Sequence, residues 1–259
     1  MGILLDLDGT IVDSMMSLKD TFLALSRMIG AEIDEEKQRK IGEEIRYVMA
    51  GRATRLAELG FVWRIGKILK LTWWRRLLLT LIAYPALKRA AQRAPPVKGV
   101  VEAIVSLKGK PNIRLGLVTS RNRKDTLHKL KTLGLLQHFD AIVTRDDVKT
   151  FKPSPEQVRL ASRMLQVPVY ACVLVGDMPT DVLAAREAGA LAVGVATGIF
   201  YEEVRSSNPD LTIASAADLP KSLSKICSRL RRTDGACEAP GRLIEPTTQR
   251  HGQSIREGV

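Results

Sequence analysis

The sequence predicts an α/β protein in which a mostly parallel sheet is flanked by helices, with a helical segment inserted after the first strand. Three observations predict this class: short apolar runs, helical patterns with charged faces between those runs, and one long segment without a convincing strand. A chain of 259 residues is long enough for one sizeable domain and an insertion. Its 45% apolar and 26% charged residues are ordinary for a globular protein.

Five short apolar runs are predicted to be buried strands. Each ends in small or polar residues, and helical patterns with charged faces separate them. Strands that alternate with helices predict parallel pairing, because a parallel neighbour needs a crossover connection. The runs are Ile3–Leu5, Ile113–Val118, Ala141–Val143, Ala171–Val175 and Leu191–Val195.

The segment 15–95 interrupts this alternation and predicts helices over 18–29, 35–49 and 63–87. Pro95 and Pro96 close it and return the chain to the α/β pattern. We therefore assign residues 1–14 and 96–232 to the core and 15–95 to a helical insertion. Residues 233–259 keep no periodicity, which predicts a disordered tail.

Basic residues outnumber acidic residues by 40 to 28, which gives a formal net charge of +12. Segment 61–93 contains no acidic residue. Such a segment favours association with anionic surfaces, either nucleic acid or acidic lipid, through Lys and Arg contacts to phosphate. The same charge also attracts anionic small molecules toward a cleft. The two uses stay open at this point.

The apolar run 77–87 raises the question of a membrane. It has eleven residues without a charge, whereas a spanning helix needs about 20 apolar residues, so no transmembrane segment is predicted. A helix lying on a membrane is an alternative, because Trp63, Trp73 and Trp74 sit among basic residues. We favour a helix that packs its leucine face within the insertion and keeps its arginines in solvent.

The cysteines and the start of the chain predict a cytoplasmic protein. Cys172, Cys227 and Cys237 form no Cys-x-x-Cys pair, which argues against a zinc or redox motif and is typical of a reducing compartment. The chain starts directly with a strand-like run and shows no secretory leader. The oligomeric state is not predicted.

Two strand ends carry paired carboxylates. Asp6 and Asp8 follow the first strand, and Gly9 then allows a sharp turn. Asp177 and Asp181 follow the fourth, with Asp181 about one turn into a helix. Ligands bind beyond the carboxyl ends of strands in open α/β sheets. Close carboxylates repel one another unless a cation lies between them or they share a proton. A hard ion such as Mg²⁺ prefers oxygen ligands and accompanies phosphate groups. Capping of turns and helices by the same acids is the alternative.

Phosphate-binding chemistry is indicated at two further places. Thr119 and Ser120 end another strand, where hydroxyls and free backbone N–H groups suit a phosphate. Lys152 lies in a loop restrained by Pro153 and Pro155, where its charge would neutralise a transferring phosphoryl group. Taken singly, the two features are explained more simply by a helix cap and by an exposed surface lysine.

Together these segments resemble the haloacid dehalogenase superfamily, in particular its phosphoglycolate-phosphatase-like branch. The resemblance covers about residues 1–215 and rests on four motifs in order: Asp-x-Asp-Gly-Thr from Asp6, a strand ending in Thr119, the Lys-Pro pair at Lys152, and Gly-Asp-x-x-x-Asp ending at Asp181. It implies a Rossmann-like core with a helical cap inserted after the first motif. It also implies a Mg²⁺-dependent phosphatase that acts on a small phosphate ester.

The resemblance further implies a role for each residue. Asp6 is the expected nucleophile, and Asp8 protonates the leaving oxygen and then activates water. Thr119, Ser120 and Lys152 bind the phosphoryl group. Asp8 also indicates phosphoryl transfer rather than dehalogenation, because dehalogenases of the superfamily lack an acid there.

The resemblance places Mg²⁺ on Asp6, the backbone carbonyl of Asp8 and Asp177, with Asp181 supporting them through water or an outer contact. Pyrophosphatase and sugar phosphomutase are alternatives with the same phosphoaspartate. A protein that binds anionic membranes or nucleic acid through its basic cap is the alternative outside enzymes. Arg121 and Met178 depart from residues common among close phosphoglycolate phosphatases, so the substrate is left open.

Overall fold

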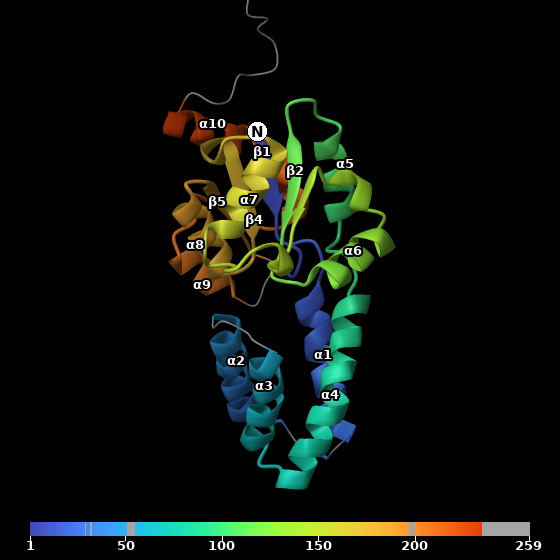
Figure 1. Cartoon of the computed structure of the whole chain (residues 1–259). Helices are drawn as coiled ribbons and strands as arrows, with labels where there is room; N and C mark the ends of the chain where they lie inside the picture. Colours follow the sequence, from blue (N-terminus) through green and yellow to red (C-terminus); the bar gives the residue numbers. More distant parts are fainter. Residues whose placement is uncertain (29, 32, 51–54, 197–199, 235–259) are drawn as a thin grey trace, which may run out of the picture.

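The computed structural model describes residues 1–28, 30–31, 33–50, 55–196 and 200–234. These residues form two parts, a sheet covered by helices and a bundle of helices at one end of it (Figure 1). Residues 233 and 234 of the predicted tail continue the last helix, α10 (Leu219–Asp234). The rest of the predicted tail lies outside the described residues.

The sheet has six strands in the order β3-β2-β1-β4-β5-β6, and every neighbouring pair is parallel. The predicted parallel α/β class is therefore confirmed. The sixth strand was not predicted, because only one of its three residues is buried and no apolar run marks it. The strands are β1 (Gly2–Leu5), β2 (Arg114–Val118), β3 (Ala141–Val143), β4 (Cys172–Gly176), β5 (Leu191–Val195) and β6 (Leu211–Ile213).

Helices cover both faces of the sheet. Successive strand residues point to opposite faces, so Ile3 and Leu5 join one apolar cluster and Leu4 joins the other. The first cluster includes residues of α5 (Val100–Lys108), α6 (Arg123–Thr132) and α10. The second includes residues of α7 (Glu156–Leu165), α8 (Pro179–Ala188) and α9 (Tyr201–Ser206). Short 3-10 turns occupy Leu136–His138, Arg145–Asp147, Val169–Ala171 and Ala216–Asp218.

Four of the helices between β1 and β2 have an apolar cluster of their own. They are α1 (Ser14–Met28), α2 (Glu35–Ala50), α3 (Arg55–Ile68) and α4 (Trp73–Arg93). The single helix predicted over 63–87 was wrong, since α3 ends at Ile68 and α4 begins at Trp73. Lys70 between them has a φ of 55°, a left-handed conformation that ends a helix. Leu69 and Leu71 on either side are buried and hold the turn.

The leucines of α4 do not share one face. Leu79 and Ala83 are buried against the other helices, whereas Leu77, Leu78 and Leu81 are exposed. The expectation of a leucine face packed within the insertion was therefore wrong for these three. No helix among the described residues is long and apolar enough to cross a membrane.

Two paired linkers join the insertion to the core. Asp13 N donates to the carbonyl of Pro95 over 2.9 Å, and Val97 N donates to the carbonyl of Ile11 over 2.9 Å. The buried Lys129 of α6 donates to the carbonyls of Gln92, at 2.7 Å, and Ala94. These contacts satisfy carbonyls at the end of α4, which have no partner within the helix.

Candidate active site

The acidic motifs lie at the carboxyl ends of the two central strands. The strand order reverses between β1 and β4, which is where open α/β sheets bind ligands. Asp6 continues directly from β1, and its backbone N–H donates to the carbonyl of Val175 in β4 over 2.9 Å. Asp177 follows β4 at the same edge, and Thr119 follows β2.

Three carboxylates meet at this edge. Oxygens of Asp6, Asp177 and Asp181 all lie within 4.8 Å of one another. The three side chains are buried, with exposures of 5%, 1% and 2%. Asp181 is on the first turn of α8, and one of its oxygens accepts a hydrogen bond from the backbone N–H of Met178 over 3.1 Å. This bond caps α8 and turns the other oxygen of Asp181 toward the cluster.

The ammonium group of Lys152 lies between two of these carboxylates. Its Nζ donates to Oδ1 of Asp6 and to Oδ1 of Asp181, each over 2.5 Å, and to the carbonyl of Val118 over 3.2 Å. Lys152 reaches the cluster from the loop before α7. Gln157 of α7 ties that loop to β2, since its Oε1 accepts from the Lys152 backbone and its Nε2 donates to the carbonyl of Thr119.

Burial and charge act against each other in this cluster. Burial raises the pKa of Asp6 to about 7, although Lys152 opposes the shift. Burial, followed by the nearby Asp6 and Asp181, raises the pKa of Asp177 well above its usual range. Burial alone would lower the pKa of Lys152, but Asp181 and Asp6 outweigh burial and raise it. With all three carboxylates ionised, one ammonium group would leave an excess of two negative charges, which is why burial and mutual repulsion favour protonation here.

The cluster fits a divalent cation. Carboxylate oxygens are the ligands that hard divalent ions prefer, and one such ion would neutralise the excess charge. The first motif can lie close to Asp177 because residue 9 is a glycine, whose φ is +81°. A Cβ at this position would lie 1.9 Å from Oδ2 of Asp177. Thr10 also lies here, with its hydroxyl 3.4 Å from Oδ1 of Asp177.

The two predicted phosphate-binding hydroxyls differ in their surroundings. Thr119 is buried, and its Oγ1 accepts a hydrogen bond from the backbone N–H of Arg121 over 3.1 Å. Ser120 is exposed. The turn after β2 therefore places Thr119 at the edge that Asp6 and Asp177 share, and Ser120 faces outward.

Asp8 does not join the three-carboxylate cluster through its side chain. Its carboxylate is bound by both arms of the Arg121 guanidinium, Nε to Oδ2 and Nη2 to Oδ1, at 2.5 Å each. Burial lowers the pKa of Arg121, but the attraction of Asp8 outweighs it and raises the pKa. The roles expected of Asp8, a metal ligand through its backbone carbonyl and an acid–base group through its carboxylate, stay predictions.

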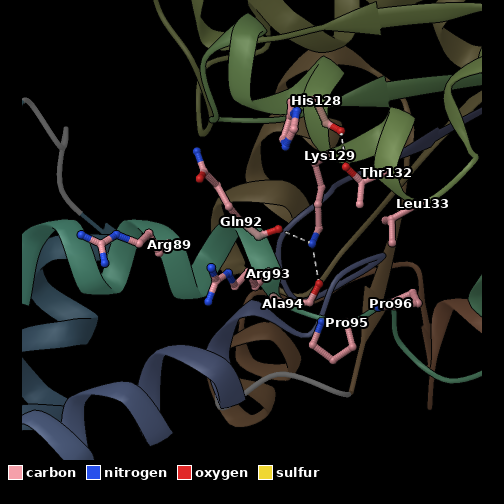
Figure 2. Close-up of a pocket in the computed structure, with 10 residues that line it drawn as sticks. All are labelled: Arg89, Gln92, Arg93, Ala94, Pro95, Pro96, His128, Lys129, Thr132 and Leu133. Carbon is pink, nitrogen blue, oxygen red and sulfur yellow. Dashed lines mark hydrogen bonds between the residues drawn. The ribbon is translucent and has the colours of Figure 1, made fainter.

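A cavity of about 470 Å³ lies beside the site and not within it. Figure 2 shows the cavity where the end of α4 meets α6, with Lys129 pointing to the carbonyls of Gln92 and Ala94. Its other lining residues include Arg89, Arg93 and His128. No carboxylate lines it, so the acid chemistry belongs to the buried cluster at the sheet edge.

The sequence motifs pointed to four acids, to Thr119 and to Lys152. The structure brings Asp6, Asp177, Asp181 and Lys152 together and places Thr119 at the same edge, whereas the side chain of Asp8 is held by Arg121. Gln157 and Thr10 were missed as contributors. Gln157 carries no signal in the sequence, because its role depends on a bond to β2. Thr10 belongs to the first motif, but its contact with Asp177 spans 167 positions.

Comparisons with known proteins agree with this geometry. The family model for haloacid dehalogenase-like hydrolases matches residues 1–189. Pyrophosphatase PpaX of Halalkalibacterium halodurans is 34% identical over 125 residues, which cover 48% of this chain and 58% of that protein. Phosphoglycolate phosphatase of Neisseria meningitidis is 28% identical over 229 residues, which cover 84% of this chain and 91% of that protein.

A solved structure resembles the whole arrangement. The crystal structure of a predicted phosphoglycolate phosphatase from Haemophilus somnus superposes with a TM-score of 0.67, covering 85% of this chain and 96% of that one. The sequence identity is 20%. At that identity the likeness shows the fold, and it extends over the helical insertion as well as the sheet.

Proposed function

Because this chain belongs to the haloacid dehalogenase-like hydrolase family, we propose that it is a Mg²⁺-dependent phosphatase that hydrolyses a small phosphomonoester through a phosphoaspartate at Asp6. The observation that carries the proposal is the contact between Lys152, Asp6 and Asp181 inside a buried cluster of three carboxyl groups. A carboxylate that is buried, oriented and partly neutralised is suited to attack phosphorus, since its hydration has already been removed.

In the first step, an oxygen of Asp6 attacks phosphorus and the bond from phosphorus to the ester oxygen breaks. Asp8 gives its proton to that leaving oxygen, so the alcohol departs neutral. Lys152 holds Asp6 in place and offsets charge on the phosphoryl oxygens. In this step one of the two hydrogen bonds from Arg121 opens, so that the oxygen of Asp8 that it releases carries the proton, and the other hydrogen bond keeps the carboxyl group oriented.

In the second step, Asp8 as a carboxylate takes a proton from water. The oxygen of that water attacks phosphorus, and the bond from phosphorus to Asp6 breaks. Inorganic phosphate leaves and both aspartates return to their starting states. The hydroxyl of Thr119 hydrogen-bonds phosphoryl oxygens throughout, and Ser120 contributes at the outer side of the same turn.

We further propose that Asp6, Asp177 and the backbone carbonyl of Asp8 hold Mg²⁺, with Asp181 beside them. When bound, Mg²⁺ would offset the excess negative charge of the cluster and stabilise charge on the phosphoryl oxygens. We assign residues 15–95 the role of a cap that selects the substrate. Names of the relatives favour phosphoglycolate or a similar small ester, with pyrophosphate as the second candidate.

The test is hydrolysis of a generic aryl phosphate by the purified chain, with and without Mg²⁺, beside Asp6→Asn. Asp6→Asn is expected to lower turnover by roughly 10⁴-fold, as loss of a nucleophile does. Asp20→Asn, an exposed residue of α1, serves as the matched control and is expected to retain activity. Equal Mg²⁺-dependent turnover by wild type and Asp6→Asn would falsify the proposal.

Two further measurements separate the candidates. Rapid acid quench followed by mass spectrometry should find phosphate on the peptide that contains Asp6 during turnover of wild type. A comparison of kcat/KM for phosphoglycolate, inorganic pyrophosphate and a hexose phosphate then decides between the esters and pyrophosphate. Preference for pyrophosphate over every monoester would replace the first candidate with the second.

A further inference from the structure

Helix α4 carries apolar residues on two opposite faces. Its inner face packs on α1 and α3 through Leu79 and Ala83, which are 1% and 0% exposed. Six large apolar side chains project from the opposite side over about two and a half turns, in two adjacent rows of residues four apart. We call this the outer α4 face: Trp73 at 70% exposure, Trp74 at 50%, Leu77 at 47%, Leu78 at 43%, Leu81 at 65% and Ile82 at 40%.

An apolar face on the solvent side of a helix is unusual. The solvent side of a helix in a globular protein ordinarily carries polar and charged residues, and a helix that is apolar on all sides is ordinarily covered. Singly exposed apolar residues are common, but a contiguous patch of them marks an interaction surface. Among the described residues no element packs against the outer α4 face in the way that α1 and α3 pack against the inner one.

Basic residues surround the outer α4 face. Lys67, Lys70 and Arg75 are exposed near its first turn, and Lys88 and Arg89 are exposed beyond its last. The guanidinium of Arg75 lies 5.1 Å from the ring centre of Trp74. No acidic residue occurs between 61 and 93. The patch therefore combines an apolar centre, tryptophans and a positively charged rim.

The position of the patch leaves it accessible. The last turn of α4 is bound to the core through Lys129, and α4 has 21 residues. Its first turn is accordingly about 30 Å away from that attachment. Figure 1 shows the connection from α3 to α4 at the end of the insertion farthest from the sheet. The tryptophans, in the first turn of α4, thus lie at the far end of the insertion. The sheet and its helices do not block the approach of a large flat partner to this end.

We propose that the outer α4 face docks onto an anionic lipid bilayer and lies in its interface. Tryptophan rings prefer the headgroup level, leucines enter the acyl boundary, and Lys and Arg attract anionic headgroups. A second copy of this chain is disfavoured as the occupant, because symmetric pairing would bring together two rims in which basic residues predominate, although Asp125 lies 3.9 Å from Lys88. A nucleic acid would leave the apolar centre of the patch uncovered.

The test is co-sedimentation of the full chain with vesicles of phosphatidylcholine and phosphatidylglycerol in equal parts, beside vesicles of phosphatidylcholine alone. Binding is expected to the anionic vesicles, to weaken as salt is raised, and to be much weaker without phosphatidylglycerol. Tryptophan fluorescence should shift to the blue on binding, since Trp73 and Trp74 would leave water. Equal binding to both vesicle types, or none to either, overturns the proposal.

Two sets of variants locate the contact. Trp73→Ser, Leu77→Ser and Leu81→Ser together should lower the partition coefficient by roughly 100-fold. The matched control replaces three exposed apolar residues on helices that cover the sheet, in Val105→Ser, Met164→Ser and Leu183→Ser. It should leave the partition coefficient unchanged. Lys67→Glu with Arg75→Glu should lower it by roughly 25-fold or more, whereas Lys110→Glu with Lys221→Glu should have much less effect.

The oligomeric state distinguishes a lipid surface from a second copy of the chain as the partner of the outer α4 face. Sedimentation velocity without vesicles should report the same oligomeric state for wild type and the Trp73/Leu77/Leu81 variant. A dimer that this variant converts to a monomer, together with no vesicle binding, assigns the outer α4 face to a second copy and overturns the proposal. No residue of this face belongs to the catalytic cluster, and the face points away from the other cap helices. A generic aryl phosphate does not test substrate selection by the cap. Its turnover should therefore stay near wild type in every variant, which keeps the test separate from the proposed function.

Discussion

The guanidinium of Arg121 binds the carboxylate of Asp8 through two hydrogen bonds of 2.5 Å, and its Nη2 also donates to the carbonyl of Ala91 over 3.2 Å. Ala91 belongs to the last turn of α4, so one side chain links the expected acid–base residue to the helical insertion. A bidentate pair of this kind fixes the orientation of the carboxylate as well as its charge.

We predict that Arg121→Lys lowers kcat for an aryl phosphate by roughly 10- to 100-fold, because a lysine keeps the charge but loses the planar fork that orients Asp8. KM should change less than kcat, since the effect acts on proton transfer. The pH–rate profile should shift as well, which a purely structural role would not produce. Wild-type kcat and an unchanged profile in this variant would show that the pair is incidental.

Divalent cations are predicted to stabilise the chain through the buried acids. Mg²⁺ should raise Tm of wild type in thermal unfolding, because binding to the native state alone stabilises it. Asp177→Asn should raise Tm without metal, since it removes one of three repelling buried carboxylates, and should abolish the increase with Mg²⁺. An equal Mg²⁺ effect in wild type and Asp177→Asn would exclude Asp177 as a ligand.

Gly9 is predicted to be required for the site in a way that other glycines are not. A Cβ there would lie 1.9 Å from Asp177, so Gly9→Ala should displace that carboxylate and lower kcat/KM by roughly 100-fold or more. Gly134→Ala is the matched control: its φ is also positive, at +67°, but nothing lies within 4 Å. It should cost stability by about 1 kcal/mol and leave kcat/KM unchanged.

Lys129 is predicted to anchor the insertion. Lys129→Met removes the donor to the carbonyls of Gln92 and Ala94 and leaves both without it, which should lower the free energy of unfolding by about 1–3 kcal/mol. Lys131→Met, on the exposed side of the same helix, should change it by less than about 0.5 kcal/mol. Denaturant titration measures both, and equal effects would contradict the anchoring role.

Asp140 is predicted to contribute pH-dependent stability. Burial acts to raise its pKa, but hydrogen bonds from Lys108 Nζ at 2.6 Å and Leu115 N at 2.9 Å outweigh it and lower the pKa. A lowered pKa means that the contribution is present above the unfolded value of about 4 and is lost as pH falls through the folded value.

Asp140→Asn should accordingly lower the free energy of unfolding by about 1 kcal/mol near neutral pH, a modest figure because the side chain is partly exposed. The difference from wild type should shrink as pH falls below about 4. Urea titrations of both proteins across this range measure it. A difference that grows toward low pH would contradict the assignment.

Much of the fold and the site was predictable from local sequence. Five strands were recognised because buried strands need continuous apolar runs, and parallel strands place their carboxyl ends at one edge. Asp6, Asp177 and Thr119 each follow such a run directly, so their meeting could be expected without coordinates. The division at 68–73 was not predictable in the same way, since Leu69 and Leu71 continue the apolar pattern and only packing makes Lys70 adopt a left-handed turn.

The sequence by itself determined the class of fold, the family motifs and which acids lie at the sheet edge, because strand periodicity and strand ends are local properties. Only the tertiary structure decided that Arg121 holds Asp8, which lies 113 positions away, and that Gln157 ties the Lys152 loop to β2. It also decided which side of α4 is covered. A helix with leucines on every side carries no periodic signal that would mark its buried face. The side of α4 that packs on α1 and α3 determines that Leu79 is buried and that Trp73 and Leu81 face outward.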